Sequence, residues 1–323
     1  MSPSLSVRTA THADVEIVAK FVKNHSNPPN SLPLDAIAVG FKRNAFPDDG
    51  SRPIAGAALA EDANGSVIAV AVFTDWFSTW QGRPILSIQH LSTLPNESLK
   101  TVFKPMLKHL AGLAVERRAT RLQWNTGPED VELKDLSKEV GAHELPEWLD
   151  VVVSHPNLES LSRRNDGLPS RTELVIRPAE PRDELAEFEN EPDQAKASHE
   201  DTELYHFPKV GAPVTETVIA ERNGVEVGFA MWLFVYDPYT SSRSLYLEDL
   251  YITPQARKHR IGTQLLSHLA SIAVNRDCLT YRWQVLDWNK GAIGFYEKMG
   301  GKVGSGKIMT RIEGDLLVEL AAK

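Results

Sequence analysis

A basic turn between a strand-like run and a helix-like run is the first stretch of this sequence that could do chemistry. The stretch TPQARKHRIGTQLL spans residues 253–266 and carries four basic residues in a row: Arg257, Lys258, His259 and Arg260. The first N–H groups of a helix have no partner within the helix, and the helix dipole adds positive potential there. The N–H groups from Lys258 through Thr263 therefore predict an anion site that suits a pyrophosphate. Taken alone, such a turn is also typical of a solvated surface.

The elements that position this turn are predicted from hydrophobic periodicity. Strands are expected at 215–222 and 225–236 around the hairpin turn Asn223–Gly224, and then at 243–252, 279–286 and 307–312. Helices are expected from Ile261 through Ala273, at 290–300 and at the C-terminal end of the sequence. Strands that alternate with helices after a hairpin indicate an α/β fold with a mixed sheet, helices lying on both faces.

The sequence contains a hidden duplication. Residues 86–124 align with residues 245–283 at a constant offset of 159 without a gap, so that Trp124 lies over Trp283, and the alignment continues to Gly141 over Gly300. The start LSVRTATHAD is also echoed by LVIRPAEPRD. A period this long indicates two copies of one fold rather than a solenoid. We expect domains at 1–155 and 173–323, joined by a polar linker at 156–172.

Composition limits the functions that the chain could have. Apolar residues make up 42% and charged residues 24% of the 323 residues, and the net charge is −8. This acidic balance argues against a nucleic-acid binder and weakly favours a cationic small molecule. No apolar run reaches the roughly 18 residues that a membrane span needs, no secretory signal pattern is present, and the one cysteine, Cys278, is expected in the core, so a cytoplasmic location is expected. The histidines and the cysteine form no metal-ligand pattern, so no metal is expected.

The motifs of the second copy resemble the GNAT superfamily of acyl-CoA N-acyltransferases. The family signature Arg/Gln-x-x-Gly-x-Gly/Ala matches 257–262, with Arg260 in place of the middle glycine. The stretches GFAMWLFVYDPY, LYLEDLYI and DWNKGAIGFYEKMG further resemble the diamine acetyltransferase branch, that of spermidine/spermine acetyltransferase and its thialysine-acetylating relatives. The resemblance implies tandem GNAT-like domains, each a mixed, mostly antiparallel sheet flanked by helices, and acetyl-CoA as the cosubstrate. If its backbone stays helical or extended, Arg260 can still present its N–H and meet a phosphate as a charged pair; an impaired loop is the alternative.

By this resemblance, the acceptor amine is held by carboxylates. Glu248 is implied as the base, acting through water, and Asp249, its neighbour on the strand, is expected on the opposite face. Asp237 matches an acidic residue of the family's amine pocket, although turn formation before Pro238 explains it equally well. Tyr239 stands where the family has tryptophan, which leaves the identity of the amine open.

The resemblance also implies a general acid and a coenzyme site. Tyr296 matches the tyrosine that protonates the departing thiolate, and a backbone N–H within Leu250–Ile252 matches the donor to the thioester carbonyl. Asn289 matches a residue that contacts the coenzyme arm, and it is also placed to cap the helix that follows. The expected coenzyme-binding residues are Leu250, Tyr251, Ile252, Arg257, Lys258, His259, Arg260, Ile261, Gly262, Thr263, Asn289 and Tyr296.

The first copy has lost these residues. At the same offset the positions of Arg257, Gly262, Asn289 and Tyr296 hold Ser98, Phe103, Asp130 and Ser137, and Glu248 and Asp249 are replaced by Gln89 and His90. Phe103 is expected to fill the pyrophosphate position, with Pro105 restricting the turn, and His90 is interpreted as structural. We therefore expect a non-catalytic first domain that shapes the pocket or replaces a partner subunit, so that the two domains pair within the chain; a homodimer stays open.

The sequence thus predicts an acetyl-CoA-dependent N-acetyltransferase that acts on a small primary amine by direct attack. A diamine, a polyamine or a lysine-like amino acid is the favoured acceptor. A peptide or protein amine is an alternative acceptor, and a non-enzymatic sensor of acyl-CoA or amine is an alternative function.

Overall fold

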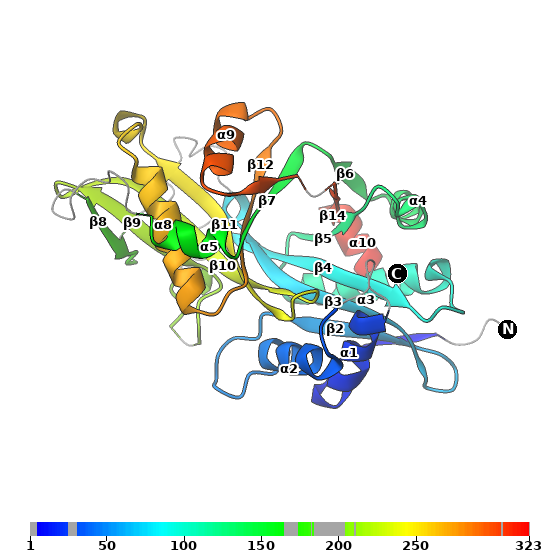
Figure 1. The fold of residues 1–323 in the computed structure, drawn as a ribbon. Coiled ribbons are helices and arrows are strands. Elements are labelled where there is room, and N and C mark those ends of the chain that lie inside the picture. The colour runs from blue at the N-terminus through cyan, green and yellow to red at the C-terminus, as the bar shows by residue number, and fades with distance from the viewer. Residues whose placement is uncertain are drawn as a thin grey trace.

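Two seven-stranded sheets lie side by side in the protein (Figure 1). The computed structural model describes residues 5–24, 31–164, 174–181, 183, 204–209, 211–304 and 306–322. The first sheet has the order β1 (Ser6–Thr9), β2 (Gly56–Glu61), β3 (Val67–Ser78), β4 (Arg83–Thr93), β5 (Arg121–Thr126), β14 (Ile308–Glu313) and β6 (His143–Leu145). The second has the order β13 (Lys302–Val303), β7 (Trp148–Ser154), β12 (Thr280–Leu286), β11 (Ser242–Ile252), β10 (Val225–Asp237), β9 (Glu216–Arg222) and β8 (Leu174–Pro178).

The helices connect and cover these sheets. They are α1 (Val15–Asn24), α2 (Leu34–Ala45), α3 (Leu99–Glu116), α4 (Val131–Glu139), α5 (Asn157–Ser162), α8 (Ile261–Asn275), α9 (Lys290–Lys298) and α10 (Asp315–Ala322), with short 3₁₀ turns η1 (His12–Asp14), η2 (Thr79–Gln81) and η3 (Pro254–Ala256). The sequence-based strands at 215–222, 225–236, 243–252 and 279–286 and the helices at 261–273 and 290–300 are therefore confirmed to within a few residues. Among the described helices, none is long and apolar enough to cross a membrane.

The two copies exchange their last elements. β7 pairs antiparallel with β12 of the second sheet, whereas β14 pairs antiparallel with β5 of the first. α5 follows β7 and packs in the second core through Leu158 and Leu161; α10 follows β14 and packs in the first core through Leu317 and Leu320. These two leucine pairs keep the offset of 159, so the duplication extends beyond Gly300 to Leu320. In Figure 1 green β7 accordingly lies beside orange β12, and red α10 lies near α3 and β5 of the first sheet.

This exchange corrects the expected organisation along the chain. The segment 156–172 was expected to be a linker, but it begins with helix α5, which is part of the second core; residues 165–172 lie outside the described residues. The strand and helix expected to complete the second domain at 307–323 complete the first sheet instead. Below, "first half" means residues 5–147 and 306–322, and "second half" means residues 148–304.

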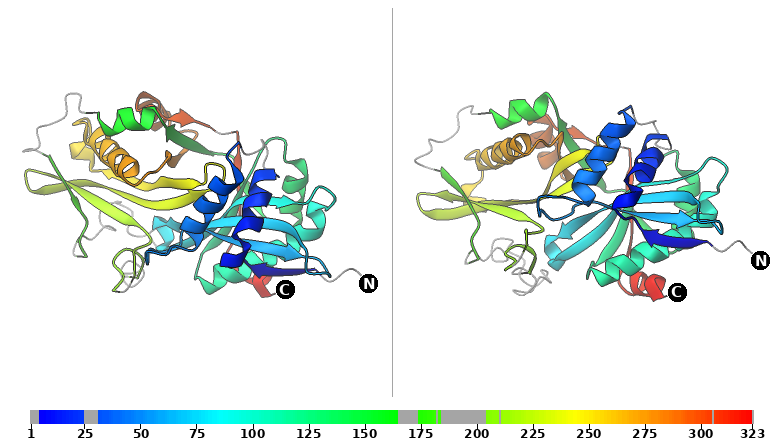
Figure 2. Two further views of the ribbon diagram at one scale, coloured as in Figure 1. Left: turned by 60° about the horizontal axis from the view of Figure 1, so that its bottom comes forward. Right: turned by 90° about the horizontal axis from the view of Figure 1, so that it is seen from below.

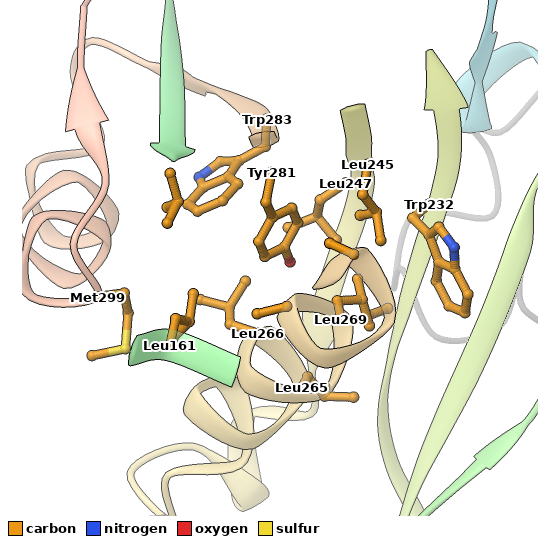
Figure 3. Packing of buried hydrophobic residues seen from close by; sticks show 14 of the residues in the cluster. Leu161, Trp232, Leu245, Leu247, Leu265, Leu266, Leu269, Tyr281, Trp283 and Met299 are labelled. Atoms are coloured by element: carbon orange, nitrogen blue, oxygen red, sulfur yellow. The ribbon is translucent and has the colours of Figure 1, made fainter. Parts of the chain in front are cut away.

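Each sheet is covered by helices that bury its apolar residues. In the first half, α1 and α2 pack on one face through Val18, Ile37 and Phe41, while α3 and α10 pack on the other (Figure 2). In the second half, α5 and α8 cover one face, and Figure 3 shows Leu161 and Leu266 beside the rings of Tyr281 and Trp283. The buried Cys278 belongs to this core, as expected, and its burial raises the pKa of the thiol to about 12.

The two halves share a buried interface. Trp76, Phe77 and Ile85 of the first half pack against Leu233, Val235 and Tyr246 of the second in one apolar cluster. The ring centroids of Trp76 and Tyr246 are 4.3 Å apart. The hairpin formed by β10 and β11 also packs against α2. There Arg243, near the start of β11, donates from Nε to Asn44 Oδ1 at 3.0 Å. The strand pairs β3–β4 and β10–β11 therefore pack on each other as two subunits of a dimer would.

The echo between the two N-terminal motifs is confirmed as a repeated ion-pair arrangement. Arg8 donates to both carboxylate oxygens of Asp14 at 2.8 Å, and Arg177 binds Asp183 in the same bidentate way at 2.7 and 2.9 Å. The hydrogen bonds from each arginine lower the pKa of its aspartate. Each pair ties the first strand of its half to the turn that follows.

Candidate functional site

A gap opens in the second sheet beside the residues predicted to do chemistry. β11 pairs with β12 only over Ser244–Tyr246, although β12 continues to Leu286. On its other side β11 stays paired with β10 as far as Ile252. The register with β10 places Leu247 opposite Trp232 and Asp249 opposite Met231, so that Glu248 is the extra residue of a β-bulge. A bulge bends the strand locally and re-aims its side chains, and such bulges are common next to active sites.

The two adjacent carboxylates have different neighbours. Glu248 Oε1 lies 3.4 Å from the backbone nitrogen of Thr79, which belongs to the first half, and the charge of Glu248 also acts on Arg121 of that half. Asp249 instead acts on Tyr296. Both carboxylates are partly buried. The bulge thus presents one carboxylate to the junction between the halves and the other to α9.

Tyr296 lies on α9 with its ring against Trp283, the two centroids being 5.0 Å apart. Burial and, secondarily, the nearby Asp249 raise the pKa of the phenol. The phenol therefore keeps its proton at neutral pH and can act as a proton donor. A tyrosine that only packed would satisfy the same ring contacts, so it is the neighbouring carboxylate and the gap that make this one chemically useful.

Asn289 fixes the start of the helix that carries Tyr296. Its Oδ1 accepts a hydrogen bond from the backbone nitrogen of Ala292 at 3.2 Å. This is the capping role that its position before the helix predicted. The cap orients the first turn of α9, and its contact with a coenzyme stays a prediction.

The loop 257–260, which was predicted to bind an anion and is called the anion loop below, has a more unusual backbone than expected. Helix α8 begins at Ile261, and both Lys258 (φ +72°) and Arg260 (φ +61°) lie in the left-handed region. The backbone condition under which Arg260 was expected to present its N–H to a phosphate is therefore not met. A non-glycine residue pays about 1–2 kcal/mol for this conformation. Arg260 thus adopts the left-handed conformation that glycine favours, and its side chain places a guanidinium at this turn.

The start of α8 is held close to the end of β11. A Cβ atom on Gly262 would lie 3.1 Å from Ile252 Cδ1 and 3.7 Å from the Phe295 ring, so a larger residue here would have to push the Ile252 side chain aside. Arg257 donates from Nε to the carbonyl oxygen of Ile252 at 3.1 Å. The N–H groups at the helix start, the end of β11 and helix α9 therefore meet around one gap. Arg257, Lys258, His259 and Arg260 are all exposed beside it.

Asp237 and Tyr239 lie elsewhere. Asp237 Oδ1 accepts from the Tyr239 backbone nitrogen at 2.9 Å, as the turn interpretation predicted. Both residues line a cavity with Gln89 and His90 of the first half, and the described lining of that cavity does not include Glu248, Asp249 or Tyr296. The structure therefore does not bring the four expected substrate-binding residues into one pocket. The turn projects from its own half and meets the other half.

Sequence reasoning missed the residues that the first half places beside Glu248. These are Thr79, through its backbone nitrogen, and Arg121, through its charge. Trp80 follows Thr79 in the chain and is 48% exposed. A signal was available, because Trp80 lies over Tyr239 at the offset of 159 and restores the tryptophan that the second copy lacks. The offset identifies equivalent positions in the two copies. It does not reveal that the turn at Thr79 reaches the second half, or that the turn at Tyr239 reaches the first half.

The first half keeps the scaffold of the site without its functional groups. It has the same bulge at Gln89, between Val72 opposite His90 and Phe73 opposite Ile88. Its helix α3 begins three residues earlier than α8 by the offset, and Ser98 Oγ caps it by accepting from the Lys100 nitrogen at 3.2 Å. The anion loop has therefore become one more helical turn with its own cap.

The remaining equivalent positions of the first half hold residues that pack or form hydrogen bonds. Phe103 is 1% exposed and packs edge-on against Trp124 in the core rather than over an anion loop. Pro105 was expected in the turn, but it lies inside α3, because the helix starts early. His90 is buried, and its Nε2 is 2.7 Å from Ser92 Oγ. Ser137, at the position of Tyr296, accepts from Trp124 Nε1 at 3.1 Å.

Among the residues that the structure describes, no group of three His, Cys, Asp or Glu side chains could hold a metal ion. The groups that the structure brings together at the gap are the 257–260 loop, two carboxylates, a protonated phenol and the exposed edge of β11.

Comparisons with known proteins agree with this geometry. The model of the acetyltransferase (GNAT) family matches residues 180–301. A thialysine N-epsilon-acetyltransferase from Mus musculus is 36% identical over 149 residues, which are 43% of this chain and 87% of the relative. An L-ornithine N5-acetyltransferase from Arabidopsis thaliana is 33% identical over 93 residues, covering 29% of this chain and 41% of the relative.

A solved structure shares the whole arrangement. A tandem GNAT protein from the clavulanic acid biosynthesis pathway aligns with a TM-score of 0.53 over 96% of this chain and 98% of its own, at 15% sequence identity. At this identity the likeness concerns the fold alone. It confirms the expected two GNAT-like units, each a mixed sheet flanked by helices.

Proposed function

Because this chain belongs to the GNAT acetyltransferase family and is an N-acetyltransferase, we propose that its acceptor is a primary amine of a small cationic molecule. A diamine, a polyamine or a lysine-like amino acid fits best. The relatives named for thialysine and ornithine support this class, since each of those acceptors carries an alkyl amine on an amino-acid backbone. Carboxylates beside the gap in the second sheet support a cationic acceptor.

The observation that carries the proposal is the convergence of three kinds of group on one gap. Glu248 and Asp249 lie at the bulge of β11, Tyr296 lies on α9 within the influence of Asp249, and Gly262 holds the start of α8 against Ile252. In the first half the same positions hold Gln89, His90, Ser137 and Phe103. We therefore assign acetyl transfer to the second half alone and regard the first half as non-catalytic.

The coenzyme fits the residues present. The N–H groups of Ile261, Gly262 and Thr263 open α8 and, with Lys258 and Arg260, would hold a pyrophosphate. The remaining coenzyme contacts that we propose are Leu250, Tyr251, Ile252, Arg257, His259, Asn289 and Tyr296. Acetyl-CoA supplies the activated acetyl group, and backbone N–H groups within Leu250–Ile252 would polarise its carbonyl.

The carboxylates have the task of producing a neutral amine. A primary ammonium has a pKa near 10.4, so removing its proton at pH 7 costs roughly 4–5 kcal/mol. Glu248 would accept this proton through a water molecule, and Asp249 would hold a second positive charge of the acceptor. Tyr296, which stays protonated at neutral pH, would donate a proton to the departing thiolate, whose thiol has a pKa of about 8.5.

The first half would complete the acceptor groove. Thr79 lies 3.4 Å from Glu248 through its backbone nitrogen, and Trp80, the next residue, exposes nearly half of its side chain. An exposed indole one residue along the chain from the contact with Glu248 suits an alkylammonium, because a cation binds over the ring face while the hydrocarbon packs on it. Trp80 is therefore our proposed substitute for the part that Asp237 and Tyr239 were expected to play.

A thiol-release assay over a panel of amines tests the proposal. Purified protein with acetyl-CoA should release coenzyme A faster with diamines, spermidine or lysine analogues than with a basic peptide. Glu248→Gln should abolish most of this turnover, whereas Gln123→Glu, which changes charge at a buried position of the first half, should not increase it. A protein that acetylates only the peptide would contradict the proposed acceptor class.

A further inference from the structure

A cavity of about 610 Å³ lies between the two halves, separate from the site described above. Its floor comes from the first half and includes Ile88, Leu99 and Phe103. Its opposite wall comes from the second half and includes Asp237, Tyr239 and Arg282. The volume is in the range of natural small-molecule sites, and an apolar floor with a few polar groups above it is their usual composition.

This cavity is the first half's counterpart of the acceptor groove. It is lined by Gln89 and His90, which lie over Glu248 and Asp249, and by Asp130, which lies over Asn289. The turn of the second half reaches it through Tyr239, just as the Thr79–Trp80 turn of the first half reaches Glu248. Since the early start of α3 removes the anion loop here, a molecule in this cavity would meet no activated acetyl group.

The charges of the cavity select a cation. Five carboxylates line it against the two cationic side chains Arg282 and Lys307; the carboxylates are Glu129, Asp130, Glu132, Asp150 and Asp237. Arg282 is 3.9 Å from Asp237, and the two cationic side chains can balance at most two of the five carboxylate charges. An apolar floor below an acidic rim suits a molecule with a hydrocarbon arm and a positively charged end.

An aromatic ring in the wall already carries a cation. The ammonium of Lys307 lies 5.5 Å from the centroid of the Tyr239 ring, and the edge of His90 approaches the same ring at 6.0 Å. This contact shows that the surroundings of Tyr239 accommodate a primary ammonium, here that of the chain's own Lys307, which a bound ligand ammonium would displace from the ring. Burial, followed by the charges of Asp237 and Asp130, raises the pKa of Tyr239 to about 12, so the ring stays a neutral phenol.

We propose that this cavity is a second, non-catalytic binding site for an alkylammonium ligand, held between the Tyr239 ring and the carboxylates of the 129–132 segment. The inference goes beyond the acetyl transfer proposed above, because it assigns a binding function to the half without chemistry. The ligand would sit across the junction, so its binding would favour the packed arrangement of the two halves.

Calorimetry with 1,4-diaminobutane tests this site apart from the reaction. The full-length protein should carry Glu248→Gln and Asp249→Asn, which disable the proposed acceptor groove, and acetyl-CoA should be left out. We expect one diaminobutane bound per chain in this background. n-Butylamine should bind more weakly because it has one charge, and n-butanol should not bind. Absence of diaminobutane binding up to millimolar concentrations would overturn the inference.

Charge-matched variants locate the site. In the same background, Glu129→Gln with Glu132→Gln should weaken diaminobutane binding at least about tenfold, or by roughly 1.4 kcal/mol. Asp135→Asn with Glu139→Gln removes the same charge from exposed positions of α4 outside the cavity lining and should change affinity less than twofold. An equal loss in both double variants would show nonspecific attraction and overturn the proposal. Because the readout is binding without coenzyme, a wrong acceptor assignment in the catalytic half would not affect it.

Discussion

The two halves of this protein share a scaffold and differ in almost every group that could act on a substrate. Both have a bulge at the equivalent position of the equivalent strand, at Gln89 and Glu248, and both place a tryptophan on the next strand, at Trp124 and Trp283. The indole of Trp124 donates to Ser137, whereas that of Trp283 packs against Tyr296. The Ser137 hydroxyl accepts a hydrogen bond in the core of the first half, whereas the equivalent Tyr296 carries a phenol near Asp249 and the gap in the second sheet.

The same difference appears at the helix that follows the bulge. In the first half, Ser98 caps an extended α3 and Phe103 fills the core. In the second half, Arg260 holds a left-handed turn, and Gly262 keeps the helix start against Ile252. A folded half therefore does not require the anion loop, and the strained turn of the second half points to a function there.

The largest expected effect contrasts Tyr296 with its counterpart. Tyr296→Phe should lower kcat by roughly 10²–10⁴-fold, because it removes a proton donor while keeping the ring contacts. Ser137→Ala should leave kcat unchanged and should cost about 1–3 kcal/mol of stability, because Trp124 loses its acceptor in a buried place. Steady-state kinetics and urea unfolding of both variants measure the contrast, and equal kcat losses would contradict it.

Phe103 sharpens the view that the first half does not bind the coenzyme. Phe103→Ala should lower the free energy of unfolding by about 3–5 kcal/mol, because it empties a buried ring position. The affinity of the remaining folded protein for acetyl-CoA should not change, since the loop that we assign to the coenzyme lies in the other half. Urea unfolding and calorimetry test the two parts; a gain or loss of coenzyme affinity would show that Phe103 lies near a working site.

The junction between the halves should weaken in acid through His206. Burial lowers the pKa of His206 to about 4, and its ring packs edge-on against Phe77 of the first half at 4.9 Å. An unfolded histidine takes up a proton near pH 6.5, which the folded one resists, so this stability is present above pH 6.5 and is lost as the pH falls towards 4. The loss at pH 4.5 should be about 2–3 kcal/mol.

Urea unfolding at pH 7.5 and at pH 4.5 measures the contribution of this histidine. Carboxylates such as Asp14 add their own losses at lower pH, because their pKa values are lowered in the folded state. His206→Gln isolates the histidine, and the variant should lose less stability between the two pH values than the natural protein does. An unchanged difference would show that His206 does not titrate as proposed.

The two junction turns give a smaller and more selective contrast. Trp80→Ala should raise KM for a diamine about tenfold, or by roughly 1.4 kcal/mol, with little change in KM for acetyl-CoA. Tyr239→Ala changes the equivalent turn of the other half, and it should leave KM for the diamine within twofold. If Tyr239 rather than Trp80 controls KM for the diamine, the acceptor groove is formed within the second half. The proposal that Trp80 of the first half completes this groove would then be wrong.

The smallest effect concerns the strained turn. Arg260→Gly should stabilise the protein by about 1 kcal/mol, because glycine adopts a φ of +61° without strain. It should also raise KM for acetyl-CoA a few-fold, because a guanidinium is lost beside the proposed pyrophosphate. Arg118→Gly, at a left-handed position in the first half with φ +58°, should give the stability gain without the kinetic effect. A gain in coenzyme affinity would show that Arg260 hinders the loop.

The sequence predicted the duplication and most strands of the second half, because alternating and helical periodicities are local signals. It could not predict the exchange of β7 and β14. β7 and β14 are equivalent at the offset of 159, and each is followed by a helix with the same leucine spacing. These leucines are Leu158 and Leu161 on α5 and Leu317 and Leu320 on α10, so the pattern of either segment fits either core. Which core each enters depends on the path of the chain between the halves.

The site was predictable to a similar degree. The loop, Glu248 and Tyr296 could be identified because their motif lies in one copy. The left-handed backbone of Arg260 could not, since arginine seldom adopts it. The contact of Thr79 with Glu248 depends on how the two copies pack, which motif matching within one copy does not address. Asp237 is separated from Glu248 within its own hairpin, because Asp237 pairs with Ser242 at the start of β11 and Glu248 lies further along that strand.

The stoichiometry of acetyl-CoA binding, measured by calorimetry, tests the division of labour most directly. We predict one acetyl-CoA per chain, weakened at least about tenfold by Arg257→Ala with Lys258→Ala and unaffected by Lys100→Ala with Lys104→Ala on α3 of the first half. Two molecules bound per chain, or a loss of affinity through the lysines of α3, would contradict the account in which only the second half holds the coenzyme.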